Sequence, residues 1–160
     1  MVESTSIEPG KDYSSLTPVL AAEMGKPPFE PKVAGRIAFF FGPIAGALVS
    51  VVSLRRAGYP LRSGKILRWT LLVSAAMAVV LVILPDALGR LFGLAAEITF
   101  YSVYPRLQQK EFYEWQGAHT EILPANGWGA IGWGVLGVVL FFVVAMAVIV
   151  PLMILFPSLQ

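Results

Sequence analysis

Residues 129–156 read GAIGWGVLGVVLFFVVAMAVIVPLMILF, a stretch without a charged side chain. A transmembrane helix needs about 20 consecutive apolar residues to cross a hydrocarbon core of about 30 Å. At ~1.5 Å per residue this stretch reaches about 42 Å. It therefore predicts a membrane-spanning helix that tilts, kinks at Pro151 or protrudes from the bilayer.

The composition of the whole chain indicates lipid as its solvent. Of its 160 residues, 56% are hydrophobic and 14% are charged, and the mean hydropathy is +0.71. Soluble domains carry about 25% charged residues, and one of this length could not hide so much apolar surface. The length suits one small bundle with tails. The sequence contains no cysteine, which excludes disulfides, thiolate metal sites and cysteine nucleophiles.

Three other segments extend the membrane prediction. Residues 33–54 and residues 66–84 each hold one charge near their start, Arg36 and Arg68. Residues 87–104 are the least apolar, and a helix lying in the membrane interface is the competing interpretation for them. A Pro-Asp pair would join the second and third helices as a tight antiparallel connection. The predicted fold class is all-α, an integral membrane four-helix bundle.

Charge distribution predicts the orientation. The loop 55–65 and its flank carry basic charges without an acid, and positive residues are enriched on the cytoplasmic side. If residues 87–104 span, most lysines and arginines fall on the cytoplasmic side. If they do not span, the opposite side holds more lysines and arginines than the cytoplasmic side. We therefore expect four spans, a cytoplasmic loop 55–65 and both termini on the other side.

The basic residues also allow a binding role. They are Arg55, Arg56, Arg62, Lys65 and Arg68. Such a cluster can serve only as a topology signal, or it can bind anionic lipid headgroups or an acidic partner. Nucleic-acid binding is disfavoured because aromatic side chains are not interleaved with the cations.

The regions outside the predicted spans differ in character. Residues 1–32 mix charges, serines and prolines, which is typical of an extended or mobile N-terminal arm. An arm that docks on a partner subunit is the alternative, with these anchors: Tyr13, Leu16, Leu20, Met24 and Phe29. Residues 105–127 form the longest predicted loop. In this amphipathic loop Phe112 and Trp115 suit the headgroup level.

Small residues mark the middle of the first predicted span. Gly42 and Gly46 stand four residues apart, so both lie on one helix face and allow another backbone to approach closely. Pro43 removes a helical hydrogen bond at the same place. A helix-packing notch is the first interpretation, and a hinge or substrate-facing break of the kind found in transporters is the second.

A polar stripe follows the third predicted span. It consists of Arg90, Leu94, Glu97, Tyr101 and Tyr104, at spacings that put them on one helix face. A carboxylate at bilayer depth costs about 2.5–3.5 kcal/mol on insertion scales, so Glu97 should face protein. There are three alternatives: an interhelical clamp, a proton relay or ligand site, and a helix lying in the membrane interface on which Glu97 is hydrated.

No catalytic constellation is found. His119, the only histidine, lies in a predicted loop with few possible co-ligands and is most simply a solvated surface residue. The sequence has no Ser-His-Asp set, HExxH, P-loop or dinucleotide fingerprint. We therefore expect no enzyme activity, no metal and no cofactor.

One segment carries a resemblance. Residues 39–46, FFFGPIAG, followed by SLRRAG at 53–58, resemble small uncharacterised bacterial multi-pass membrane proteins, in which an aromatic-rich Gly-Pro-small-Ala-Gly segment leads into an Arg-Arg-x-Gly turn. The resemblance covers about twenty residues. It implies the bacterial inner (plasma) membrane and four spans, and it brings no activity or catalytic residues.

These features give two functional hypotheses. The first is a non-catalytic accessory or assembly subunit that packs against larger integral membrane subunits of a complex, for example an energy-transducing one. Its partners would include membrane lipids. The second is a small oligomeric transporter or channel that uses Glu97. A membrane enzyme acting on lipids has no nucleophile to nominate.

Overall fold

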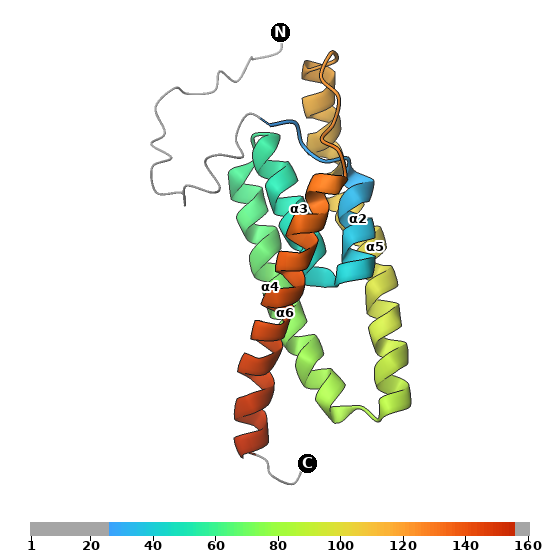
Figure 1. Ribbon diagram of the computed structural model, residues 1–160, viewed down its shortest axis with the longest axis vertical. Coiled ribbons are helices and arrows are strands. Elements are labelled where there is room, and N and C mark those ends of the chain that lie inside the picture. The colour runs from blue at the N-terminus through green and yellow to red at the C-terminus, as the bar shows by residue number, and fades with distance from the viewer. Residues whose placement is uncertain (1–25, 156–160) are drawn as a thin grey trace.

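The computed structural model describes residues 26–155, and within them the secondary structure is helical (Figure 1). The helices are α2 (Pro31–Phe41), α3 (Pro43–Arg56), α4 (Pro60–Ile83), α5 (Asp86–Ala118) and α6 (Trp128–Leu155). The described residues hold no β-strand, only an isolated bridge between Phe29 and Ala125. The prediction of an all-α fold is confirmed over this range.

The first predicted span is not one helix. At Gly42 the backbone takes φ 86° and ψ 172°, a conformation that is essentially restricted to glycine, and α3 starts afresh at Pro43. The two helices fold back on each other, so that Ser53 Oγ donates to the Phe29 carbonyl at 3.0 Å. The expectation of a continuous helix over 33–54 was therefore wrong, and both ends of this segment lie at the same end of the molecule.

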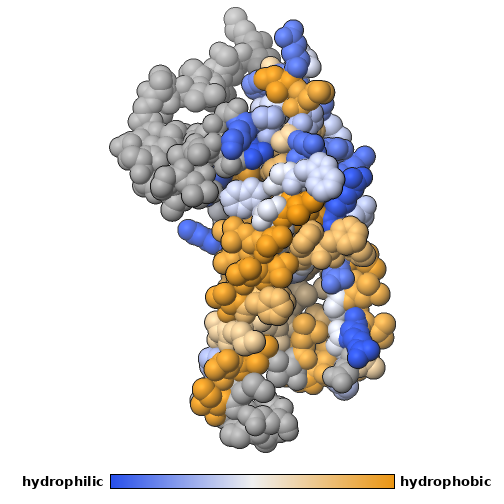
Figure 2. All heavy atoms as spheres, viewed as in Figure 1, coloured by the Kyte–Doolittle hydropathy of each residue, from blue (hydrophilic) through white to orange (hydrophobic). Residues whose placement is uncertain are grey.

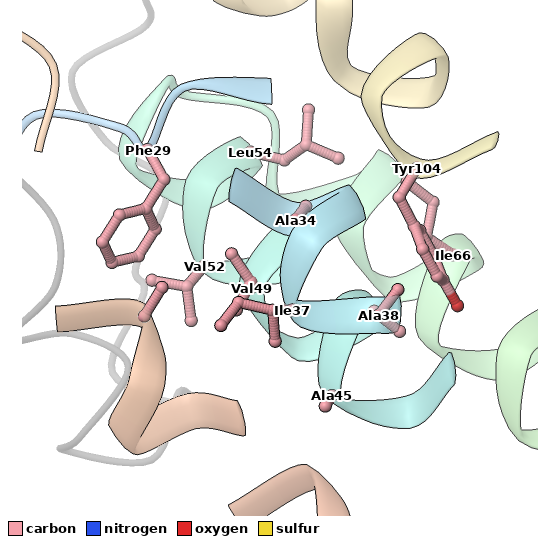
Figure 3. Close-up of a cluster of buried hydrophobic side chains, with 12 residues drawn as sticks. Phe29, Ala34, Ile37, Ala38, Ala45, Val49, Val52, Leu54, Ile66 and Tyr104 are labelled. Carbon is pink, nitrogen blue, oxygen red and sulfur yellow. The ribbon is translucent and has the colours of Figure 1, made fainter. Parts of the chain in front are cut away.

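Helix α3 is the centre of the fold. Every residue from Pro43 to Leu54 is buried, and α3 contacts α2, α4, α5 and α6. Ala45, Val49 and Val52 belong to the buried apolar cluster drawn in Figure 3, to which α2 contributes Ile37 and Ala38. Helix α3 is thus enclosed by α2 and the longer helices.

Two helices have the length and hydropathy of a membrane span. They are the portions Pro60–Leu81 of α4 and Trp128–Pro151 of α6, and at most about a fifth of either window is buried. Helix α6 continues through Pro151. Helix α5 does not pass the same test over the described residues, although it is the longest helix, with 33 residues.

The boundary expected at residue 104 is absent. Helix α5 runs through Pro105 to Ala118, so most of the predicted loop 105–127 is helical. Proline lacks the N–H that would bond the carbonyl of Tyr101 one turn earlier. A Cβ on Gly35 would lie 2.5 Å from that carbonyl oxygen, so only glycine lets α2 approach α5 here. The close approach covers the carbonyl that proline leaves unpaired.

The described part of the predicted N-terminal arm is packed against the bundle. Phe29 is 2% exposed, and the Arg56 guanidinium lies 4.4 Å from the centre of its ring. The amide of Ala125 donates to the Pro28 carbonyl at 2.9 Å. Phe29 therefore anchors on its own chain. The other proposed anchors, Tyr13, Leu16, Leu20 and Met24, lie outside the described residues.

Candidate functional site

The five basic residues of the 55–68 region separate into two groups. Arg55 and Arg56 end α3 and turn inward: Arg55 Nε donates to Ser63 Oγ at 3.2 Å, and Arg56 donates to the Pro27 carbonyl at 3.2 Å. Burial lowers the pKa of Arg55 from its ordinary value, because it disfavours the charged form. These two arginines therefore hold the hairpin to its surroundings.

Arg62, Lys65 and Arg68 form the second group, on the exposed surface of α4. Arg62 makes an ion pair with Glu111 of α5 and donates to the Leu107 carbonyl at 3.1 Å. Lys65 and Arg68 make no ion pair with another described residue. They are the cations of this region that remain available to a ligand.

A buried polar pair on α5 was missed from the sequence. Gln108 is 1% exposed and Glu111 is 3% exposed. Gln108 Nε2 donates to the Pro31 carbonyl at 3.2 Å, while Gln108 Oε1 and Glu111 Oε2 have no hydrogen-bond partner. The sequence does carry a sign of this burial. Gln108 and Glu111 follow Tyr104 at helical spacing, so they continue its helix face past Pro105.

Next to this pair, Tyr59 Oη donates to Glu114 Oε2 at 2.6 Å. The hydrogen bond to the carboxylate is the main cause that raises the pKa of Tyr59 above its ordinary value. The contact ties the short α3–α4 connection to the last turns of α5.

The predicted small-residue notch is filled by the chain itself. A Cβ on Gly46 would lie 2.4 Å from Ala38 Cβ and 2.9 Å from the ring of Tyr104, whereas none at Gly42 would meet an atom within 4 Å. Gly35 against α5 and Gly137 against Ala45 of α3 make equally close contacts. The sequence pattern singled out Gly46 but neither of these.

The predicted polar stripe on α5 is divided by its surroundings. Tyr104 is 1% exposed; its hydroxyl donates to the Pro43 carbonyl at 2.8 Å and lies 3.0 Å from that of Thr70. Arg90 is exposed and Glu97 is half-buried, and neither has an ion pair or hydrogen bond with another described residue. The structure therefore does not bring Arg90 and Glu97 together.

Tyr101 of the same stripe lies on the outer surface. Its ring packs edge-on against Phe39 of α2, with centroids 6.1 Å apart. These two residues, together with Arg36, Phe40 and Ile98, line an open hollow of about 380 Å³ between α2 and α5. We name this hollow and its five residues the α2–α5 hollow.

His119 follows the end of α5 and is exposed. Its ring stacks on Trp115 with centroids 4.9 Å apart, and Nδ1 lies 2.9 Å from the Trp115 carbonyl oxygen. Among residues 26–155 no group of three metal-ligating side chains comes together. His119 thus packs beside α5 instead of joining a cluster.

Comparison of the chain with protein-family models, with curated proteins and with solved structures finds no match.

Proposed function

We propose that this chain is a non-catalytic accessory or assembly subunit, embedded in the inner (plasma) membrane, that packs against larger integral membrane proteins. In the proposed arrangement α4, the first half of α5 and α6 cross the bilayer. The hairpin of α2 and α3 enters and leaves on one side, because its helices have 11 and 14 residues. At ~1.5 Å per residue these reach only about 16 and 21 Å.

The distribution of charge supports this orientation. We call the end where α2, α4 and α6 begin and α3 ends the polar end. Every described lysine and arginine except Arg90 lies at or near it, and Figure 2 shows hydrophilic residues gathered over that end and hydrophobic ones beyond it. By the positive-inside rule the polar end is cytoplasmic. The N-terminal side of α2 is then cytoplasmic too, unlike in the four-span arrangement.

The observation that carries the proposal is the exposure of α5. Between Ala87 and Val103 no described side chain is buried, whereas α4 buries one at nearly every turn. This stretch includes Arg90 and Glu97, together with the exposed Thr99 and Ser102. Lipid tails offer no partner for an arginine or a carboxylate, and each costs about 2.5–3.5 kcal/mol at the bilayer centre. A helix of another membrane protein would supply the missing partners.

The surface beside this stretch suits such a partner. The α2–α5 hollow is open and aromatic, and Phe40 at its edge is 76% exposed. Large aromatic side chains around an unfilled hollow are typical of the centre of a protein interface. We therefore place the partner against α5 and the neighbouring face of α2.

The proposal is tested by site-specific photocrosslinking in the native membrane. A crosslinker at Leu94 of α5, which is 50% exposed, should capture one discrete membrane protein, whereas one at Val139 of α6, 54% exposed, should capture lipid. Gentle solubilisation should yield a complex larger than the chain. Crosslinking of Leu94 to lipid alone, with the chain migrating at its own mass, would overturn the proposal.

An oligomeric transporter or channel is the second candidate, favoured by the position of Glu97. It lies two turns before the buried Tyr104, so both project from nearly the same side of α5. Reconstituted vesicles test this candidate. Glu97→Gln should abolish proton or ion flux, while Glu121→Gln, in the exposed loop before α6, should not. An unchanged flux in Glu97→Gln would remove this candidate.

A further inference from the structure

A linear groove runs between α4 and α5, on a face separate from the α2–α5 hollow. Its volume is about 410 Å³, and each helix contributes one stripe of side chains to it. The apolar lining consists mainly of Ile66, Trp69 and Val73 from α4 and Phe100, Val103 and Leu107 from α5. We call it the α4–α5 groove.

The two ends of the α4–α5 groove differ in charge. Arg62 and Lys65 form the end nearer the polar end of the molecule, and Val73 and Phe100 form the other. Arg62 shares its charge with Glu111, but Lys65 has no ion pair with another described residue. Trp69, beside Lys65, is 68% exposed. A tryptophan next to cations is typical of the level of the glycerol and headgroup region.

The interior of the α4–α5 groove suits an apolar ligand. Its hydroxyl groups, those of Thr70 and Tyr104, lie 3.0 Å apart, and Tyr104 also bonds the Pro43 carbonyl. They are therefore satisfied within the protein and need nothing from a ligand. A ligand that is charged at one end and apolar along its length fits this distribution.

The apolar part of the groove fits within one leaflet. From Ile66 to Val73 the helix rises about 11 Å at ~1.5 Å per residue. Half of a hydrocarbon core of about 30 Å is about 15 Å. A phospholipid whose headgroup lies at Lys65 would place an acyl chain along the whole groove without leaving its own leaflet.

We propose that the α4–α5 groove binds one anionic glycerophospholipid of the cytoplasmic leaflet, with its phosphate at Lys65 and Arg62 and one acyl chain along the apolar lining. The inference rests on the membrane location in the proposed function but not on the partner subunit. Arg55 and Arg56 take no part, because they are turned into the protein.

Native mass spectrometry of the full chain in mild detergent tests the proposal. Phosphatidylglycerol and phosphatidylcholine with the same acyl chains are titrated separately. A single phosphatidylglycerol should bind, and Lys65→Glu should weaken it by about tenfold or more, because a cation beside the phosphate becomes an anion. Lys32→Glu is the matched control: it makes the same charge change at the polar end but outside the groove, and it should leave the affinity nearly unchanged.

A second pair of variants tests the acyl-chain site. Val103→Trp, at a groove position that is 36% exposed, should reduce the binding of both lipids by filling the lining, whereas Val135→Trp on the exposed face of α6 should not. Helical circular dichroism and a monodisperse elution profile show that each variant is folded. Equal losses of phosphatidylglycerol affinity in Lys65→Glu and Lys32→Glu, or unchanged lipid binding in Val103→Trp, would overturn the proposal. Because the assay uses the purified chain, its failure leaves the subunit proposal intact.

Discussion

At the scale of single residues, glycines decide how closely the helices pack. Gly35, Gly46 and Gly137 each stand where a Cβ would come within 2.6 Å of an atom of a neighbouring helix. The sequence could indicate Gly46 because Gly42 stands four residues before it. It could not indicate which helix approaches, since a small-xxx-small pattern describes one surface of the contact only.

Gly46→Ala is expected to lower the free energy of unfolding by about 1–3 kcal/mol, the usual cost of overpacking. Its Cβ would overlap Ala38 Cβ, and neither that atom nor the buried ring of Tyr104 can move away freely. The measurement is denaturant unfolding in detergent micelles.

Gly132→Ala is the control for this prediction. Gly132 is a helical glycine of α6 with open space around its Cβ position, so alanine there should raise stability by about 0.5–1 kcal/mol. Equal effects of the two substitutions would contradict the close packing of α2 against α3.

The polar residues that make the tertiary contacts were harder to predict. Gln108 and Glu111 lie in a segment that reads as a loop after Pro105. Their burial depends on two facts that local sequence does not contain: the helix continues past the proline, and α2 and α4 cover that stretch. Tyr104, by contrast, was recognised from its spacing, although its bond to Pro43 depends on the hairpin.

At the scale of the elements, the largest difference from the sequence prediction is the reversal at Gly42. Hydropathy stays high on both sides of this residue, and the periodic pattern carries no information about chain direction. Pro43 indicates a kink, but a proline is also favoured at the first position of a new helix. Only the positive φ of Gly42 separates the two outcomes.

Gly42→Ala is therefore expected to destabilise the protein by about 1–3 kcal/mol, the cost of holding a residue with a Cβ in this backbone region. No atom lies within 4 Å of its Cβ position, so the effect would come from the backbone alone. The free energy of unfolding, measured as above, checks it.

The direction of the effect distinguishes the two architectures. In a continuous helix over 33–54, alanine at this position would raise stability by about 0.5–1 kcal/mol. Gly64→Ala in α4, where the glycine has no close neighbour and no positive φ, should show that increase. A rise in stability for Gly42→Ala would argue against the hairpin.

At the scale of the whole molecule, the composition indicated a helical membrane protein, and the described residues are helical with two helices that fit a span. The sequence predicted four crossings, whereas two helices among the described residues have the length and hydropathy of a span. Counting charges around four assumed spans placed cations on both sides. With the hairpin folded back, the cations of the described residues gather at one end, Arg90 excepted.

The proposed orientation is tested by single cysteines, since the natural chain contains none. Lys32→Cys and Gln116→Cys, both exposed at the polar end, should be protected from a membrane-impermeant maleimide in intact bacterial cells and react after lysis. Ala87→Cys, beside the α4–α5 connection, should react in intact cells.

Lys32→Cys is the deciding position. A helix that spans from 33 to 54 would put it on the opposite side from Gln116, so its labelling in intact cells would exclude the hairpin arrangement. Gln116→Cys and Ala87→Cys serve as the inside and outside controls, because both architectures place them alike.

The enclosure of α3 by the other helices also has a consequence for the order of assembly. During synthesis α2 and α3 precede every helix that surrounds them, and the carbonyl of Pro43 receives its hydrogen bond from Tyr104, sixty-one residues later. Lipid offers nothing that replaces this donor. Helix α3 is thus synthesised before α4, α5 and α6, but its surroundings are complete only when most of the chain has been translated.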